Sequence, residues 1–566
     1  MVDRLSPKGT AQAPIAHYMA EFLSGRSELV GASRDVFSTV VSRLTASQLE
    51  GHICIELNQQ EEHIMCKSPL VFKGDTNTSA PLVLSGGMLY FGRYYQYECS
   101  LADSLVRLSS VSYEHKNLVG LLNHFFPLQP GGIDYQREAA GTALGSSLCI
   151  IGGGPGTGKT TTIVRIVGLL LSSYGAELKI ALAAPTGKAA MRMMESINQQ
   201  CLNLDFSPEV QALFPDEAMT LHRLLGLGRF SRTPKYHKHN PMNWDVVIVD
   251  EASMVDLALM CKLTEALKQG GRLILIGDKN QLASVESGAV LADCMDVLKR
   301  QVTELQTTYR FNRDISALAA AINEGDGDKA WSLARQDGSS ILRVVSEEDG
   351  DWIEPIGQRY AEFLKRVAGS DGPDDYQQLF SKLSSFRVLC ALKQGAFGVE
   401  EINNRVERYL ARNGFECDHS LWYAGRPVMV TRNDYSLDLF NGDIGICLPD
   451  PELLGELSVW FETGDGRLRS YPPSRLPTCE TVWAMTIHKS QGSEFDEIFV
   501  VLPQSDNRVL CRELLYTSVT RARNKISFVM DEQICKAAVE RKTIRSSGLS
   551  RRLHYCLNSL TTDIQE

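Results

Sequence analysis

The residues best suited to chemistry in this chain lie in a glycine-rich stretch that satisfies the pattern G-x-x-x-x-G-K-[ST] from Gly153 to Thr160. In this pattern the glycines let backbone N–H groups converge on phosphate oxygens, the lysine reaches the β- and γ-phosphates, and the hydroxyl binds Mg²⁺. We therefore predict that Lys159 holds phosphate and that Thr160 holds Mg²⁺. The predicted cradle comprises Gly153, Gly154, Pro155, Gly156, Thr157, Gly158, Lys159, Thr160 and Thr161.

The segments on either side of this stretch have the order that a phosphate-binding loop requires. An apolar run at 148–151 is typical of a buried parallel strand, and apolar residues at helical spacing follow the loop from Ile163 to Leu170. A glycine-rich turn with an ordinary surface lysine would not need both neighbours. The order strand, loop, helix thus favours a nucleotide site over that alternative.

An acidic pair, Asp250 and Glu251, follows another apolar run at 246–249. A nucleotide-bound Mg²⁺ keeps several waters and takes one or two carboxylates, so an acid at the end of a buried strand suits a metal role. We assign Asp250 to Mg²⁺ and Glu251 to the general base that orients the attacking water. The alternative is an acid pair that only stabilises the N-terminus of a helix.

Two further side chains could act on the same phosphates. Gln281 follows an apolar run at 273–276 and could contact the γ-phosphate or the attacking water, although a loop amide needs no such role. Arg310 is the first basic residue after the apparent end of the first domain near Gln301. An arginine that approaches from a second domain can neutralise transition-state charge, but Arg310 could equally be an ordinary ion-pair residue.

The elements that must position these residues alternate between strands and helices. Apolar strand candidates recur at 148–151, 180–183, 246–249 and 273–276, with helical stretches between them. This alternation predicts a parallel sheet with helices on both faces, and ligands of such sheets bind outside the carboxyl ends of the strands. Polar residues follow each of the four runs, so we expect them to meet at one edge of the sheet.

Length and composition place the chain among large globular proteins. Its 566 residues should form about three to four domains. No apolar run approaches the roughly 18 residues that a membrane helix needs, and residues 1–20 lack a secretory-signal pattern, so we expect a cytoplasmic protein. The 14 cysteines include no C-x-x-C pair, which argues against a zinc site, an iron–sulfur cluster or a disulfide framework.

One segment departs from the acidic character of the chain, whose net charge of −10 argues weakly against a nucleic-acid coat. Residues 220–244 contain no acidic side chain and combine basic residues with aromatic ones, a mixture that suits contact with a nucleic-acid backbone and its bases. A solvated loop with incidental charge is the alternative. The residues concerned are Arg223, Arg229, Arg232, Lys235 and Lys238, with His222, His237, His239, Phe230 and Tyr236 among them.

Regions outside the nucleotide-binding segment complete the predicted organisation. Residues 1–125 carry no chemical motif and are predicted to form a mainly helical domain that docks partners, followed by a link rich in Pro and Gly. The first nucleotide-binding domain is predicted at 126–303. A second α/β domain is predicted at 304–566, and short strands and turns predict a small β-barrel inserted in it at about 420–478.

A set of motifs in this order resembles the superfamily 1B DNA helicases, over roughly residues 130–530. The residues of these motifs are similar to those of the RecD group, the alpha subunits of exodeoxyribonuclease V. The run R-S-S-G-L at 545–549 also resembles a segment of that group. The motifs are Gln136, the phosphate loop, A-P-T-G-K-A-A at 184–190, D-E-A-S at 250–253, G-D-K-N-Q at 277–281, Tyr309 with Arg310, T-I-H-K-S-Q-G at 486–492 and V-T-R-A-R at 519–523.

The resemblance implies two tandem RecA-like P-loop domains with ATP and Mg²⁺ between them, a short 1B insertion at about 226–243, and an SH3-like character for the 2B barrel. It implies an ATP-dependent 5′→3′ DNA helicase and single-stranded DNA translocase. In the family this motor acts on double-strand DNA ends in recombinational repair, together with the beta and gamma subunits of a RecBCD-like heterotrimer. The family's nuclease belongs to the beta subunit, so no nuclease site is expected in this chain.

The resemblance also assigns roles to individual residues. Gln136 would read the adenine, and Glu494 would approach the ribose. Arg310 and Arg521 would reach the γ-phosphate from the second domain, beside Gln281. DNA contacts would come from the basic segment and from Thr186, Thr220, His222, Arg223, Thr486, His488 and Lys489.

Two other interpretations stay open. The chain could be a free-standing RecD-like helicase without nuclease partners, or a P-loop kinase or metabolic NTPase whose helicase-like motifs are accidental. Partners that co-purify with the native chain would argue against the first. ATPase activity that does not respond to single-stranded DNA would support the second.

Overall fold

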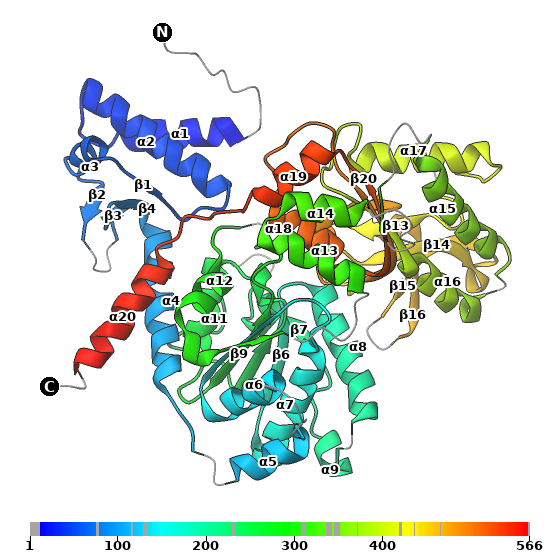
Figure 1. Cartoon of the computed structure of the whole chain (residues 1–566), viewed down its shortest axis with the longest axis horizontal. Helices are drawn as coiled ribbons and strands as arrows, with labels where there is room; N and C mark the ends of the chain where they lie inside the picture. Colours follow the sequence, from blue (N-terminus) through cyan, green and yellow to red (C-terminus); the bar gives the residue numbers. More distant parts are fainter. Residues whose placement is uncertain are drawn as a thin grey trace.

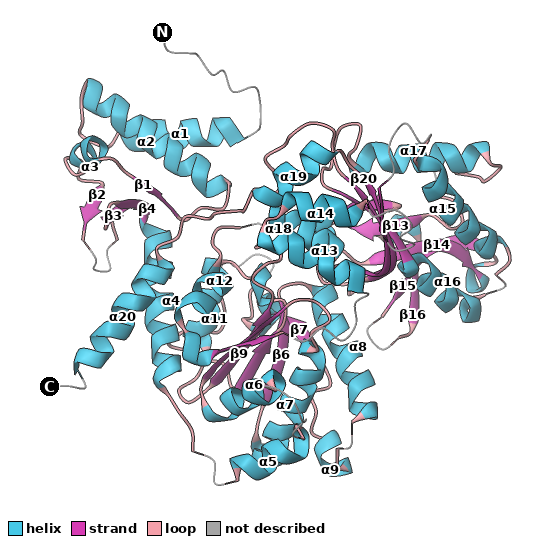
Figure 2. Ribbon diagram, viewed as in Figure 1, coloured by secondary structure: helices cyan, strands magenta, loops and turns pink. Residues whose placement is uncertain are grey.

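The computed structural model has a small N-terminal region, two α/β domains that are each built on a parallel sheet, and an antiparallel β insertion in the second domain (Figure 1). Helices cover both faces of each parallel sheet (Figure 2). This confirms the predicted fold class. The structure describes residues 12–74, 79–114, 117–127, 134–204, 206–228, 233–284, 286–306, 313–335, 342–344, 351–370, 372–417, 422–434, 436–463 and 466–563.

The N-terminal region packs helices against a four-stranded sheet of order β1-β4-β3-β2. It is therefore helical with a small sheet. Its elements are α1 (Gln12–Ser24), α2 (Ala32–Leu49), β1 (Cys54–Glu56), α3 (Gln59–Met65), β2 (Val71–Lys73), β3 (Leu82–Ser85), β4 (Met88–Phe91) and α4 (Gly92–Ser110).

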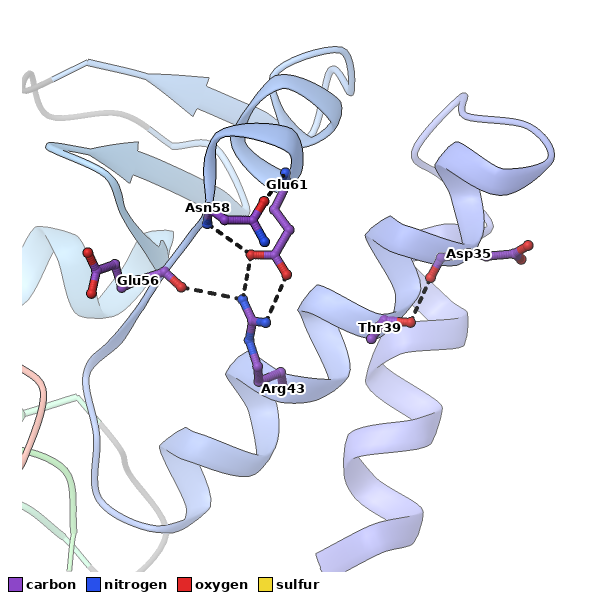
Figure 3. Close-up of polar contacts among 6 residues, drawn as sticks. All are labelled: Asp35, Thr39, Arg43, Glu56, Asn58 and Glu61. Atoms are coloured by element: carbon purple, nitrogen blue, oxygen red, sulfur yellow. Dashed lines mark hydrogen bonds and ion pairs between the residues drawn. The ribbon is translucent and has the colours of Figure 1, made fainter. Parts of the chain in front are cut away.

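Arg43 on α2 ties this helix to α3 (Figure 3). Its guanidinium donates to both carboxylate oxygens of Glu61, at 2.8 and 2.9 Å, and to the backbone oxygen of Glu56 at 3.3 Å. Glu61 also accepts from the backbone N of Asn58, whose side chain accepts from the backbone N of Glu61, so α3 begins with a capping box. A bidentate arginine pair fixes relative orientation, and α2 and α3 thus form a stiff corner.

The first α/β domain contains a six-stranded parallel sheet of order β10-β5-β9-β8-β6-β7. Helices α5 to α8 contribute to the core on one face of the sheet, and α4, α11 and α12 pack on the other. The strands are β5 (Leu148–Gly153), β6 (Ile180–Ala184), β7 (Ala218–Thr220), β8 (Val246–Val249), β9 (Arg272–Gly277) and β10 (Val302–Leu305). The helices are α5 (Leu118–Phe125), α6 (Tyr135–Gly145), α7 (Lys159–Tyr174), α8 (Gly187–Asn203), α9 (Pro208–Gln211), α10 (Leu221–Leu224), α11 (Leu257–Ala266) and α12 (Val290–Val297).

The second α/β domain contains a five-stranded parallel sheet of order β11-β20-β19-β12-β18. Helices α13, α14, α18 and α19 pack on one face, and α15 to α17 on the other. The strands are β11 (Leu342–Val344), β12 (Phe386–Cys390), β18 (Ala484–Thr486), β19 (Phe495–Val501) and β20 (Ala522–Val529). The helices are α13 (Arg313–Glu324), α14 (Gly327–Ala334), α15 (Ile353–Ala368), α16 (Pro373–Ser385), α17 (Val399–Arg412), α18 (Arg512–Val519) and α19 (Glu532–Glu540).

The insertion is an antiparallel sheet of order β16-β15-β14-β13-β17, with a small core of its own. Ile446, Leu448 and Trp460 extend from it into the core of the second domain, so the insertion and the domain share one packed interior. Its strands are β13 (Pro427–Val430), β14 (Ile444–Asp450), β15 (Glu456–Glu462), β16 (Leu468–Tyr471) and β17 (Cys479–Thr481).

The end of the chain returns to its beginning. Helix α20 (Leu549–Asp563) lies beside α4, and its Leu549 and Leu553 are fully buried in the core that α4 shares with the first parallel sheet (Figure 1). The N-terminal region, the first domain and the C-terminal segment are therefore one packed unit. Among the described residues, no helix combines the length and the apolar character needed to cross a bilayer.

Candidate active site

The glycine-rich loop connects β5 to α7, as the sequence predicts. Gly156 and Gly158 have φ angles of 76° and 83°, in the left-handed region that glycine adopts readily. Lys159 Nζ donates to the carbonyls of Gly153 at 2.7 Å and Gly154 at 3.0 Å, so its ammonium lies over the loop itself. Phosphate oxygens are charged and accept hydrogen bonds more strongly than carbonyl oxygens do. Lys159 is therefore placed to exchange its bonds to these carbonyls for bonds to phosphate.

The acidic pair follows β8 and has two features that are common at active sites: a raised pKa at Asp250 and a left-handed backbone at Glu251. Burial raises the pKa of Asp250 to about 6; the charge of Glu251 adds to the rise, while the backbone N–H of Glu251 and the charge of Lys159 oppose it. Glu251 has φ 51° and ψ 39°, a left-handed conformation that is uncommon outside glycine. Such strained positions persist where the surrounding structure fixes them, and they cluster at functional sites.

A hydrogen-bond network links Gln281 to the second domain. Gln281 is buried after β9, and its Nε2 donates to Asp278 Oδ2 at 3.2 Å. The same carboxylate oxygen accepts from Tyr516 Oη of α18 at 3.0 Å. The amide oxygen of Gln281 is buried and has no partner among the described residues, so it can accept from a donor that enters the cavity.

One cavity of about 310 Å³ brings the predicted nucleotide residues of both α/β domains together. The first domain contributes the phosphate loop, the acidic pair and Gln281, and the second contributes segments near 492–494 and 521–523. Four cationic and four anionic side chains face one another across it. They are Lys159, Arg192, Arg521 and Arg523, and Glu195, Asp250, Glu251 and Glu494; Pro155, Gly156, Gly158 and Thr160 are also part of the lining.

Arg521 is buried in this cavity and is held by backbone oxygens. Its Nε donates to the carbonyl of Thr517 and its Nη1 to that of Ser493, both at 3.1 Å. Nearby Arg523 donates to Glu494 Oε2 at 3.0 and 3.1 Å. Within the described part of the chain, the guanidinium of Arg521 thus bonds neutral acceptors only, which a phosphate could replace.

Several lining or network residues were not singled out from the sequence. Arg192 lies on α8, one helical turn after Lys188 of the motif at 184–190, and that spacing was the available signal. Tyr516 stands in the run before V-T-R-A-R, but nothing in the sequence pairs it with Asp278, 238 residues away.

Other predicted residues are placed differently. Gln136 is at the N-terminus of α6, where Asp134 caps the helix, and is not among the described residues that line the cavity. Thr161 belongs to α7 just behind the loop. Arg310 lies outside the described residues, so its role stays a prediction.

Three threonines predicted to contact DNA are N-caps of helices that follow strands. The side-chain oxygens of Thr186, Thr220 and Thr486 accept from backbone N–H groups three residues ahead, at 3.2, 3.2 and 3.4 Å. Thr220 and Thr486 are the last residues of β7 and β18, and Thr186 lies two residues beyond the carboxyl end of β6. Backbone N–H groups at such positions favour anionic oxygens, so both parallel sheets present the same kind of edge.

The remaining DNA candidates differ in exposure. His222 and Arg223 are exposed, and Arg223 pairs with Glu217 at 3.0 Å. Lys489 pairs with Glu480, and burial, with a smaller effect of Arg545, lowers the pKa of His488. Part of the basic segment, 229–232, lies outside the described residues.

A cavity of about 1030 Å³ separates the first domain from the β insertion. Thr220 and Arg223 line one wall, and insertion residues such as Phe440 and Arg469 line the other. The ring of Phe440 approaches the first domain so closely that a Cβ at Gly187 would lie 2.9 Å from it. The insertion thus covers the edge of the sheet where the DNA candidates stand.

Two family models match the parts of the chain that line the nucleotide cavity. The model of the AAA domain family matches residues 136–287, which hold the phosphate loop, the acidic pair and Gln281. The model of the UvrD-like helicase C-terminal domain matches residues 481–529, which hold Glu494 and Arg521. Among solved structures, Bacteroides Pif1 bound to single-stranded DNA superposes with a TM-score of 0.41 at 16% identity, over 71% of this chain and 94% of that chain.

Similar proteins cover most of the chain. RecBCD enzyme subunit RecD of Mycolicibacterium smegmatis is 41% identical over 83% of each chain, and that of Haemophilus influenzae is 33% identical over 87% of this chain and 84% of its own. The ATP-dependent RecD2 DNA helicase of Deinococcus radiodurans is 30% identical over 74% of this chain and 52% of its own. With two motor domains around one nucleotide cavity, and with this identity over this length, the chain belongs to the RecD family of superfamily 1 DNA helicases.

Proposed function

We propose that this chain uses ATP hydrolysis to move 5′→3′ along single-stranded DNA, as the motor subunit of a RecBCD-like helicase–nuclease that acts on double-strand DNA ends. The observation that carries this proposal is the cavity that both α/β domains line. A nucleotide held there contacts Lys159 of one domain and Arg521 of the other. Because ADP lacks the γ-phosphate, hydrolysis changes how strongly the two domains are held together.

The residues of the cavity divide the chemistry of ATP hydrolysis among them. Thr160 and Asp250 supply hard oxygen donors of the kind that Mg²⁺ takes, and the bound ion would neutralise charge on the β- and γ-phosphates. Glu251 orients the attacking water, and the unpartnered amide oxygen of Gln281 accepts from that water. Arg521 stabilises the charge that develops on the γ-phosphate.

The same proposal assigns less direct roles to three other residues. Arg310 would supply a second positive charge at the γ-phosphate. Gln136 would recognise the adenine, and Glu494 would approach the ribose. Glu494 lines the cavity and supports its assignment, whereas the roles of Gln136 and Arg310 rest on their places among the sequence motifs.

Single-stranded DNA would cross the carboxyl edges of the two parallel sheets, under the β insertion. The capped helix starts at Thr186, Thr220 and Thr486 would take backbone phosphates, and the exposed His222 and Arg223 would add to them. The cavity beneath the insertion supports this path, because it joins two of these residues to aromatic side chains. Lys489 and His488 would contact the strand from the second domain.

The partners of the motor would be the two other subunits of such an enzyme. Relatives that share 41% and 33% identity carry the name RecBCD enzyme subunit, and their similarity includes most of this chain. The N-terminal region, which carries no chemical motif, would dock them. The nuclease would belong to a partner, so the purified chain should not cut DNA.

An unwinding assay with two substrates tests the motor. The chain, alone and in its native complex, is given duplexes with either a 5′ or a 3′ single-stranded tail, at saturating ATP and Mg²⁺. We expect unwinding of the 5′-tailed duplex by the chain's motor, with loss of that activity in a Lys159→Ala variant. Unwinding that requires a 3′ tail would overturn the polarity.

A free-standing helicase is the second candidate, because one relative at 30% identity, from Deinococcus radiodurans, is named an ATP-dependent RecD2 DNA helicase and not a RecBCD subunit. Native pull-down of the tagged chain, followed by unwinding assays on each fraction, separates the two. Co-purification of two large subunits with the active fraction supports the motor subunit. An active lone monomer supports the free-standing helicase.

A further inference from the structure

The segment 545–548, between α19 and α20, is a sequence motif that the proposed function does not use. The side chain of Arg545 reaches the loop that follows Gln281. Its Nη1 donates to the carbonyls of Glu286 at 2.7 Å and Gly288 at 2.9 Å, and its Nη2 donates to that of Ser284 at 2.6 Å. Because a guanidinium holds its donors in one plane, three carbonyls on one side chain fix the path of that backbone.

The N-terminal region holds the same loop from the other side. The backbone N of Gly288 donates to the carbonyl of Gly51 at 3.0 Å, and Ser287 Oγ donates to that of Gln48, on α2, at 3.2 Å. Gly51 also covers the guanidinium: its φ is 91°, and a Cβ there would lie 3.0 Å from Arg545 Cζ. The loop is therefore clamped between the end of α2 and Arg545.

The segment that carries Arg545 is itself fastened to the N-terminal region. The backbone N of Ser546 donates to His52 Nδ1 at 3.0 Å, and the backbone oxygen of Ser546 accepts from the N of Ile53 at 2.8 Å. Further on, the backbone N of Gly548 donates to the buried carboxylate of Glu98 at 2.9 Å. The N-terminal region therefore holds the segment that carries Arg545.

The other end of the loop meets the second domain. Leu282, directly after Gln281, donates through its N to Thr517 Oγ1 at 2.9 Å, and its carbonyl accepts from Gln491 Nε2 at 2.8 Å. The loop at 282–288, of which residue 285 is not described, thus begins at the seam of the two motor domains and ends at the N-terminal region. Gln281 stands at the seam end.

We propose that Arg545 is a positioning residue that couples the N-terminal region to ATP hydrolysis. By holding the loop at 282–288, it keeps Gln281 aligned in the nucleotide cavity while the N-terminal region is seated on the first domain. Helix α2 connects the two parts, because Arg43 fixes it to α3 (Figure 3) and the carbonyl of Gln48 near its C-terminal end accepts from Ser287 Oγ of the loop. A partner that binds the N-terminal region can thereby change turnover. This inference rests on the proposed role of Gln281.

The apolar packing of the N-terminal region does not depend on this clamp. Helix α4 and the buried Leu549 and Leu553 of α20 share a core with the first parallel sheet, and Arg545 is not part of that core. Loss of the Arg545 contacts should therefore misplace the loop without releasing the region. This separates a positioning role from a structural one.

The test is Arg545→Lys in the full chain and in its native complex, with ATP turnover measured at saturating ATP and DNA. Lysine keeps the charge but carries its three donors on one nitrogen, so it cannot span three carbonyls. We expect kcat to fall roughly ten- to a hundredfold, as misplacement of a catalytic group does, with the KM for ATP unchanged and the variant still folded at the assay temperature. The matched control is Arg551→Lys, which removes bonds to the carbonyls of Ser85 and Gly86 but does not touch the loop, and its kcat should match wild type.

A second variant shows whether the effect passes through the loop. Ser287→Ala removes the bond to α2, and its effect on kcat should be less than additive with that of Arg545→Lys. Wild-type kcat in Arg545→Lys, or equal losses in Arg545→Lys and Arg551→Lys, would overturn the coupling. Either result leaves the proposed function intact if Lys159→Ala is inactive, whereas an active Lys159→Ala would overturn that function itself.

Discussion

Opposing electrostatic effects act on the pKa of Asp250 in the nucleotide cavity. Burial and the neighbouring Glu251 oppose its ionisation and raise its pKa to about 6, while Lys159 favours the charged form. Above that pH the carboxylate is charged at an energetic cost, which a nucleotide-bound cation would offset. A raised pKa of this kind is common at active sites and is consistent with the magnesium role proposed for Asp250.

Lys159→Ala should abolish most ATP hydrolysis without unfolding the chain. The lysine bonds only the carbonyls of its own loop, so its loss leaves the packed core unchanged, while the developing charge on the phosphates loses its nearest cation. We expect a loss of roughly a hundredfold or more in kcat, in line with loss of a preorganised electrostatic contact. Steady-state ATPase assays and a melting curve measure the two quantities, and near-wild-type turnover would remove the central claim.

Tyr516→Phe should lower ATP turnover although Tyr516 does not line the cavity. Its hydroxyl shares Asp278 Oδ2 with the amide of Gln281, so its loss frees the carboxylate to move and loosens the alignment of that amide. We expect kcat to fall about tenfold, because the contact acts on geometry, with little change in the KM for ATP.

The control for this tyrosine is Tyr376→Phe. Tyr376, on α16, is equally buried and donates a single hydrogen bond, to the carbonyl of Pro449, but stands on the far face of the second sheet. It should lose stability without a specific loss of kcat. Equal kinetic losses in the two variants would argue against a positioning role for Tyr516.

At the scale of elements, the sequence predicted those strands that are buried on both faces of the sheet. The four runs at 148–151, 180–183, 246–249 and 273–276 are the cores of β5, β6, β8 and β9, because strands covered on both faces read as continuous apolar runs. Strand β10 contains Thr303 and Glu304, and β7 is three residues long, so neither gives such a run. The order of motifs predicted the nucleotide residues for the same reason: loops after buried strands converge.

Contacts between distant elements could not be predicted from one sequence. Tyr516, Thr517 and Gln491 stand within or beside motifs, but their partners Asp278 and Leu282 are more than 200 residues away in the chain. No local periodicity records such pairs. The attachment of the 545–548 segment to the N-terminal region was likewise invisible, since hydrogen bonds to backbone groups impose little on residue type.

Glu98 on α4 should make the melting temperature depend on pH. It is fully buried, and burial raises its pKa to about 7, against favourable bonds from Gly548 N and Ser547 Oγ and the charge of Arg552. Because the folded state then binds more protons than the unfolded state, this group's contribution to stability falls as pH rises from its ordinary pKa to about 7 and is constant above. The loss amounts to at most about 3 kcal/mol, from 1.36 kcal/mol per pKa unit.

Glu98→Gln is the measurement of that contribution. Glutamine stays neutral and can accept the same two hydrogen bonds, so the variant should melt above wild type at pH 8 and at the same temperature near pH 5. All other titrating groups are common to both chains, and the difference between the two melting profiles isolates Glu98. Parallel profiles over this range would contradict the raised pKa.

On the scale of the whole molecule, the net negative charge disfavours DNA binding, whereas local surface features favour it. The chain carries a net charge of −10, which repels a polyanion at long range. In the proposed path, DNA binding depends on local features: capped helix starts along two sheet edges, exposed basic side chains, and the β insertion that covers them. Since both motor domains would contribute to this path and also line the nucleotide cavity, we propose that closure of the two around ATP changes the grip on DNA.

Arg223→Ala tests this electrostatic path. Arg223 is exposed at the wall of the large cavity, and its ion pair with Glu217 is also exposed, so a phosphate can take the place of that carboxylate. Its removal should weaken binding of single-stranded DNA and reduce the slope of log K against log salt by about 0.7, the value for one phosphate contact on a single strand. The control is Arg508→Ala, an exposed arginine that pairs with Glu50 away from this surface. Anisotropy titrations of a labelled oligonucleotide at several salt concentrations give both slopes, and equal slopes for the two variants would show that DNA does not follow the edge at Arg223.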